Sequence, residues 1–529
     1  MSSELGDGSS QSGPGGGPRH ALWIQLVAVV LLLACAAPYW SSTKDDAYIF
    51  MTCARNARDG QGLGLNEGEP VYCISSMAWF ALSWLLLHFS DDPYFILRLV
   101  GQASAVLALL VMLAFVARRH RLPLIGLAGA LMFACDPALA RWSVVGMEAP
   151  LATLLCALVF WTAHCQLHRE GRFDWVPTVI AAGVLVRLEF VFLGLFWAII
   201  TLGRLLLGPR SHVLRQVRSL LISAVPLFLV CVAIGAFGLL EFGQPMPSTV
   251  AAKSGQPLTT AYMRLLLSRV LGSAIGPSLV LLGGFAAVCL RRGLRQLFRC
   301  CDGVDALMAA WVIGLPVVWI CTGAGPGTRY MCPLTPFIGI LAVRLVEIAI
   351  RPAADVPVRP SASRGRSVAW VGVVASCLAS QLAVNYLIYI PHAEMTREKN
   401  RVLLQVCNWV NQKLPPEAVI ASYDVGYLAW YTQNRIIGTD GLNLPLDRVR
   451  FIQSHGINAL LQREQADYAY APDGSIFGYL PREAHTLDVD EVHATKVAEW
   501  TRVYPQRFYN GRIKPCRMWR LTYSTGEDR

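Results

Sequence analysis

The chain has 529 residues, of which 54% are hydrophobic and only 15% are charged, and its mean hydropathy is +0.44. Soluble domains carry about 25% charged residues, so this balance excludes an ordinary soluble protein and indicates a polytopic membrane protein. The formal net charge of +11 does not indicate nucleic-acid binding. Most arginines outside the C-terminal region lie in short loops between apolar segments, where membrane topology places them.

The chain begins with a segment rich in Gly, Ser and Pro, residues 1–20, which we interpret as a disordered cytoplasmic tail. Apolar segments then recur as far as residue 390, and most are long enough to cross a hydrocarbon core about 30 Å thick. We predict a transmembrane domain over residues 21–390 with eleven spans: 21–40, 96–117, 122–139, 148–167, 175–186, 190–203, 219–240, 272–290, 304–321, 332–350 and 368–390.

One further apolar stretch, Ile74–Phe89, could be a span or a helix lying on the membrane surface. The surface placement puts every arginine-rich loop on one side, with 17 lysines and arginines in the inner loops and 9 in the outer ones. This asymmetry places the N-terminus inside and makes residues 41–95 a large first outer loop. Trp79 and Trp84 suit such an interfacial helix.

The stretch 175–203 contains Arg187 and Glu189 at its middle. A single helix would bury both charges in lipid at a cost of several kcal/mol. We therefore predict two short spans with a break between them on the outer side.

Residues 391–529 contain frequent charges and no apolar run long enough to span a membrane. Helical spacing of Val402, Val406 and Val410 ends at Pro415-Pro416, and short strand-like runs follow. Because an odd number of spans precedes this region, we predict a small extracytoplasmic α/β domain.

The predicted outer face collects seven charged residues from several loops: Asp45, Asp46, Glu148, Arg187, Glu189, Lys253 and Arg329. A base together with cations is what transfer from a lipid phosphate needs. The acidic pair Asp45-Asp46 is the candidate catalytic centre. Its alternative role is to cap the helix beginning near Ala47.

Other candidates have simpler alternatives. Lys253 could clamp a phosphate or merely be solvated, and Glu148 could complement a helix dipole. Arg329 lies in a short glycine loop near the lipid headgroups. The pairs Cys53 with Cys73 and Cys407 with Cys516 could be disulfides in an oxidising compartment, or free thiols.

Short motifs follow one another in a characteristic order: Asp45-Asp46-Ala47-Tyr48-Ile49, Ala54-Arg55-Asn56, Gly60-Gln61-Gly62-Leu63, Asn66-Glu67-Gly68-Glu69-Pro70-Val71, Gly146-Met147-Glu148-Ala149-Pro150-Leu151, Arg187-Leu188-Glu189, Ala252-Lys253-Ser254-Gly255, Arg329-Tyr330 with Pro333, Asp424-Val425-Gly426-Tyr427 and Asp440-Gly441-Leu442. They resemble a bacterial GT-C glycosyltransferase group that includes the mycobacterial arabinofuranosyltransferases with decaprenyl-phosphate sugar donors. Ser248 and Leu188 depart from it, standing where that group usually has asparagine and proline.

The resemblance implies inverting transfer of a sugar from a polyprenyl-phosphate donor to a cell-envelope glycan, lipid or protein acceptor. It implies Asp45 as the base with Asp46 assisting, and Lys253 and Arg329 as ligands of the donor phosphate. Tyr48 and the charged residues of the later loops become candidate substrate-binding residues. No metal or other cofactor is implied, and the enzyme would lie in a bacterial inner membrane.

Two other functions compete with this one. A transporter or lipid flippase would place ionisable residues at mid-membrane on broken helices, whereas here they lie at loop ends. A non-catalytic membrane assembly protein would keep the fold but not the acidic pair, which is intact here.

Overall fold

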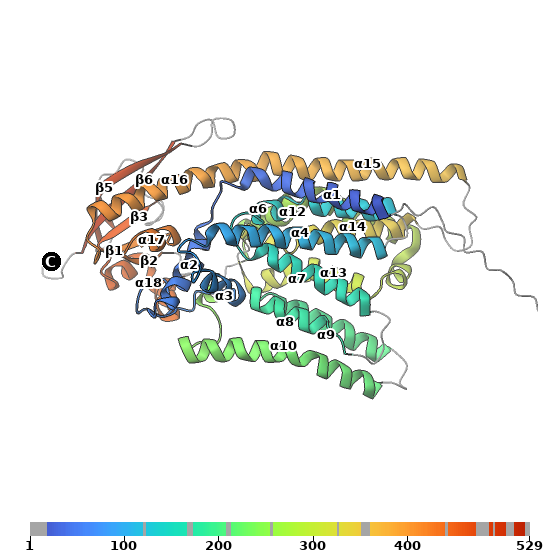
Figure 1. Cartoon of the computed structure of the whole chain (residues 1–529), viewed down its shortest axis with the longest axis horizontal. Coiled ribbons are helices and arrows are strands. Elements are labelled where there is room, and N and C mark those ends of the chain that lie inside the picture. Colours follow the sequence, from blue (N-terminus) through green and yellow to red (C-terminus); the bar gives the residue numbers. More distant parts are fainter. Residues whose placement is uncertain are drawn as a thin grey trace, which may run out of the picture.

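The computed structural model describes residues 18–119, 123–166, 173–207, 213–253, 258–324, 327–350, 360–439, 443–471, 486–489, 492–503 and 513–523. The tail 1–17 and the motif residues 254–255 and 440–442 lie outside them. A bundle of long helices makes up the N-terminal three quarters of the chain, and a mixed sheet with its helices lies at one end of that bundle (Figure 1).

The helical part contains α1 (Pro18–Ala36), α2 (Asp45–Arg58), α3 (Met77–Leu86), α4 (Tyr94–Arg119), α5 (Pro123–Ala134), α6 (Pro137–Trp142), α7 (Ala149–Gln166), α8 (Val176–Val186), α9 (Phe190–Leu207), α10 (Val213–Phe242), α11 (Ser248–Lys253), α12 (Thr260–Cys300), α13 (Gly303–Thr322), the 3-10 turn η3 (Thr328–Met331), α14 (Thr335–Ile350) and α15 (Pro360–Val384). Eight helical segments of the described residues are long and apolar enough to cross a membrane. The protein is therefore a multi-pass membrane protein.

Of two predicted membrane regions, one differs from the structure and the other agrees with it. Residues 122–139 form no single span, because Asp136 caps a new short helix, α6, and Pro137 opens it. The stretch 175–203 is divided as predicted, with α8 ending at Val186 and α9 beginning at Phe190. The charged residues between them are thereby kept out of either helix.

The apolar stretch within the first outer loop forms α3, a helix of 10 residues, which is too short to cross a bilayer. Trp84 is 40% exposed, in agreement with an interfacial position, but Trp79 is wholly buried. Its indole N–H donates to the carbonyl of Gly146 at 3.2 Å, so this residue packs inside the protein and the expectation for it was wrong.

The C-terminal region begins with α16 (Ile390–Lys413), which continues from α15 through a π-helical turn, η4 (Asn385–Tyr389) (Figure 1). Its remaining elements are β1 (Val419–Ser422), α17 (Gly426–Tyr431), β2 (Arg435–Gly438), α18 (Leu446–Arg463), β3 (Tyr468–Ala471), β4 (Thr486–Val489), β5 (Val492–Val503) and β6 (Ile513–Tyr523). The strands form one sheet in the order β2-β1-β3-β6-β5-β4, with β1 parallel to both neighbours and the other pairs antiparallel. This is the α/β domain that the sequence predicted.

The first loop and the α/β domain pack directly together through α2 and α17. Arg55 of α2 donates to the carbonyls of Ala429 and Trp430 at 2.9 and 3.1 Å. Tyr48 lies among Tyr94, Tyr427 and Tyr431, with ring centres 4.4 to 5.6 Å away. An aromatic cluster of this kind adds packing energy beyond its buried area.

Candidate functional site

The acidic pair forms the first two residues of α2, and each carboxylate has a different partner. Asp45 accepts hydrogen bonds from the backbone N–H groups of Gly426 and Tyr427, at 3.0 and 2.9 Å. These two residues begin α17, so Asp45 caps a helix 381 residues further along the chain instead of its own. The capping role is real, but it concerns another helix than the one expected.

The surroundings of Asp45 work against its charge. Burial and the neighbouring Asp424 raise its pKa from 3.8 to about 7, although Lys399 and the two backbone N–H groups oppose this shift. Lys399 itself forms an ion pair with Asp424. Asp45 is therefore enclosed in a polar cluster made by the α/β domain.

Asp46 has a different partner and forms an ion pair with Arg329 of η3. The Asp46 side chain is 44% exposed, whereas that of Arg329 is 11% exposed. Of the two carboxylates, Asp46 is thus the one that a substrate could reach from outside the protein.

A second, buried charge network lies beside this pair. Arg187 donates to Glu148 at 2.7 Å and to Glu189 at 2.9 Å. Burial disfavours its charge, but Glu189 and Glu148 outweigh this and hold the Arg187 pKa above its ordinary value. The two guanidinium groups of Arg187 and Arg329 flank the Tyr330 ring, with their central carbons 4.3 and 5.5 Å from its centre. Four of the predicted outer loops therefore converge around the Tyr330 ring and its two arginines.

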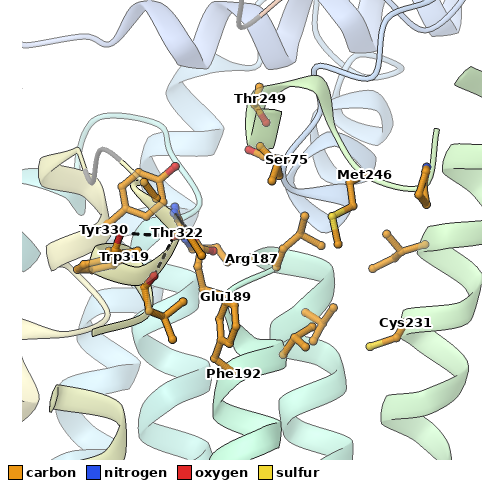
Figure 2. A pocket seen from close by; sticks show the side chains of 18 of the residues that line it. Ser75, Arg187, Glu189, Phe192, Cys231, Met246, Thr249, Trp319, Thr322 and Tyr330 are labelled. Atoms are coloured by element: carbon orange, nitrogen blue, oxygen red, sulfur yellow. Dashed lines mark hydrogen bonds and ion pairs between the residues drawn. The ribbon is translucent and has the colours of Figure 1, made fainter. Parts of the chain in front are cut away.

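A groove of about 570 Å³ begins at the Arg187 network. Its polar end contains Glu148, Arg187, Glu189 and Tyr330 (Figure 2). Its remaining walls are mainly apolar side chains from α8, α9, α10, α13 and the segment after α10, among them Val191, Phe192, Cys231, Ile234, Met246, Val318 and Trp319. α10 lies at the edge of the bundle (Figure 1), and only 6% of its apolar membrane-spanning part is buried inside the protein. One wall of the groove is therefore a helix that faces the lipid.

The structure places the remaining candidates as follows. Lys253 is the last residue of α11, whose first residue, Ser248, donates its backbone N–H to the carbonyl of Tyr72 at 2.9 Å. Cys53 and Cys73 have their sulfur atoms 3.3 Å apart and are free thiols. Cys407 and Cys516 are also free and buried. The two possible disulfides, Cys53 with Cys73 and Cys407 with Cys516, therefore stay a prediction for the protein in an oxidising compartment.

Sequence reasoning overlooked several charged residues near the acidic pair: Lys44, Arg141 and Lys399. Lys44 precedes the pair directly, which was a usable signal, whereas nothing in the sequence links Lys399 to it. Among the described residues, no group of three or more His, Cys, Asp and Glu could hold a metal ion.

Three comparisons relate the chain to known proteins. Residues 390–521 match a family described as Domain of unknown function (DUF8728). The terminal β-(1→2)-arabinofuranosyltransferase of Mycobacterium tuberculosis is 26% identical over 251 residues, which make up 44% of this chain and 38% of that protein. The chain thus matches well under half the length of this curated relative.

Solved structures cover more of the chain. ArnT from Cupriavidus metallidurans bound to undecaprenyl phosphate has a TM-score of 0.53 and 13% identity, covering 86% of this chain and 93% of that one. Its apo form has a TM-score of 0.54, 12% identity and coverages of 95% and 97%. The Archaeoglobus fulgidus oligosaccharyltransferase tethered to an acceptor peptide has a TM-score of 0.53 and 11% identity, covering 86% of this chain and 69% of that one. The protein therefore has a GT-C fold, as its motifs predicted.

Proposed function

We propose that this protein is an inverting glycosyltransferase that takes a sugar from a polyprenyl-phosphate donor on the outer face of a bacterial inner membrane. The acceptor is a glycan, lipid or protein of the cell envelope. The observation that carries the proposal is the position of Asp46. This accessible carboxylate is paired with an arginine that also lies beside the polar end of an apolar groove.

The groove supplies the donor site. Its apolar walls suit an isoprenoid tail, and its lipid-facing helix α10 gives that tail a route from the bilayer. The donor phosphate would then lie near Arg329, because charge-assisted hydrogen bonds from a guanidinium suit phosphate oxygens. The curated and solved relatives are named for glycosyl transfer or for a polyprenyl phosphate ligand, which supports the same assignment.

The base is Asp46 in this proposal, with Asp45 as a positioning residue, which reverses the roles that the resemblance implies. Both oxygens of Asp45 already accept backbone hydrogen bonds, whereas the Asp46 side chain is 44% exposed and pairs with Arg329. When the donor phosphate pairs with Arg329, the Asp46 carboxylate becomes available to the acceptor hydroxyl. Asp46 takes the proton of the acceptor hydroxyl, whose oxygen forms a bond to the anomeric carbon of the donor sugar. The bond between that carbon and the donor phosphate oxygen breaks, which releases polyprenyl phosphate.

The test is transfer by Asp46→Asn in proteoliposomes with a panel of polyprenyl-phosphate sugars. A positioned general base contributes about 10²–10⁴-fold in rate, so transfer should fall by that factor. Asp59→Asn is the matched control, because Asp59 is an exposed carboxylate at the other end of α2 that pairs with Arg58. Transfer near the wild-type rate by Asp46→Asn would remove this residue from the chemistry.

A further inference from the structure

A second group of cations lies next to the acidic pair but outside the groove. It consists of Lys44, which precedes α2, and Arg141 with Trp142 at the end of α6. The Lys44 Nζ atom is 5.4 Å from the centre of the Trp142 ring, and the Arg141 guanidinium carbon is 5.7 Å from it. None of these three residues lines the groove.

Three polar donors of this cluster lack acceptors. Nε and Nη2 of Arg141 and Nε1 of Trp142 are all buried and have no hydrogen-bond partner among the described residues. The Arg141 residue as a whole is 1% exposed. Leaving buried donors unsatisfied costs about 1–3 kcal/mol each and more for charged groups, so an unpartnered set of this kind calls for an acceptor-rich ligand.

The charges of the cluster are also uncompensated. The carboxylates that act on Lys44 are Asp46 and Asp424, and each is already paired with another cation. Burial and the nearby Arg141 lower the Lys44 pKa to about 7, because both disfavour its positive charge. A bound anion would remove this penalty.

We propose that Lys44, Arg141 and the indole N–H of Trp142 form a second anion site, which binds a phosphate group. A water molecule could accept from at most two of these donors and would neutralise no charge, so it fits the cluster less well than an anion. A phosphate group offers several oxygens to donors that approach from different directions. The phosphate could belong to a membrane lipid headgroup or to a soluble molecule, and both share this chemistry. The site is independent of the proposed transfer reaction, since it rests only on these donors and charges.

The place of the site gives it a consequence for the proposed function. α6 packs against η3, the turn that carries Arg329, and against η4. An anion at Arg141 would therefore lie on a helix that contacts the turn carrying Arg329. Its binding would restrain Lys44 and, through the chain, the neighbouring Asp45 and Asp46.

The experiment measures thermal unfolding of the full-length, detergent-purified protein against inorganic phosphate, without donor or acceptor. We expect saturable stabilisation of the wild type, and a half-saturating phosphate concentration at least about tenfold higher for Arg141→Gln. Trp142→Phe keeps the ring but loses the donor and should give a smaller shift in the same direction. Arg118→Gln is the matched control, because Arg118 also lies over a tryptophan, Trp161, at 4.5 Å, but is exposed.

A second arm compares nanodiscs of phosphatidylglycerol with nanodiscs of phosphatidylcholine. Stabilisation by phosphatidylglycerol alone, lost in Arg141→Gln, would support the site and identify the headgroup as the source. Equal responses to phosphate in the wild type and all variants would overturn the proposal, as would no response to either probe. If Arg141→Gln does not fold, Trp142→Phe and Lys44→Met carry the test. Asp46→Asn should keep the stabilisation by phosphate. A failure of the proposed transfer reaction can therefore be told apart from a failure of the proposed anion site.

Discussion

Asp46 and Arg329 form an ion pair across 283 residues of sequence, and this pair joins the first outer loop to the loop before α14. Adjacent Asp45 has different partners, at the start of α17. Two neighbouring carboxylates are thereby given separate tasks by their partners. One is held by the membrane domain at an accessible position, and the other is enclosed by the α/β domain.

The first prediction concerns the donor phosphate. Arg329→Gln should lower kcat/KM for the donor by about 10- to 100-fold while the acceptor KM changes little, because a charge-assisted hydrogen bond contributes about 1.5–3 kcal/mol. Lys253→Ala should act in the same direction if Lys253 also contacts the phosphate. Steady-state kinetics with each substrate varied separately measure the effect, and Arg58→Gln on the exposed end of α2 is the control. Equal losses for donor and acceptor would argue against phosphate binding.

The second prediction concerns pH. The fold raises the Asp45 pKa from 3.8 to about 7, so it favours the protonated carboxyl. The stability from this group is complete below about pH 4 and is lost as the pH rises through about 7. The wild type should therefore lose thermal stability relative to Asp45→Asn between pH 5 and pH 8, since asparagine does not titrate there. If the melting temperatures of the two proteins change equally with pH over that range, the Asp45 pKa is not raised in this way.

The third prediction concerns the contact between α2 and α17. A Cβ atom at Gly426 would overlap the backbone carbonyl of Asp45, which leaves no room for a side chain. Gly426→Ala should therefore separate α17 from α2, lower the melting temperature by several degrees and reduce transfer. Gly372→Ala in α15 has open space around it and should change neither quantity. Normal activity in Gly426→Ala would mean that the contact does not support the site.

The fourth prediction concerns topology. A reporter fused after Arg299 should be cytoplasmic and one fused after Gly511 should be extracytoplasmic, because lysines and arginines concentrate in the loops assigned to the inside. Alkaline phosphatase and fluorescent-protein fusions distinguish the two sides. Reports of the same side from fusions after Thr43 and Arg119 would show that α3 does cross the membrane.

Much of this arrangement could be predicted because lipid penalises charge so strongly. That penalty predicted the break at Arg187 and Glu189, and the asymmetry of the arginine-rich loops predicted that α3 does not span the membrane. It could not show that Trp79 would be buried, since tryptophan suits an interface and an interior equally well. Nor could it pair Asp45 with Gly426 or Asp46 with Arg329, because such contacts depend on how loops distant in sequence meet in space. Residues of one motif, adjacent in the chain, therefore looked equivalent until their partners were known.

The cap that Asp45 provides also has a consequence for biogenesis. Ribosomes add about 5–20 residues per second, so about 20–80 s separate the synthesis of Asp45 from that of its partner 381 residues later. Until that segment has been made and exported, the first loop lacks two of its hydrogen bonds and the aromatic contacts to Tyr427 and Tyr431. The nascent protein is thus inserted long before its acidic pair is held in position, and a chain truncated before α17 would be a membrane protein whose first loop lacks these contacts.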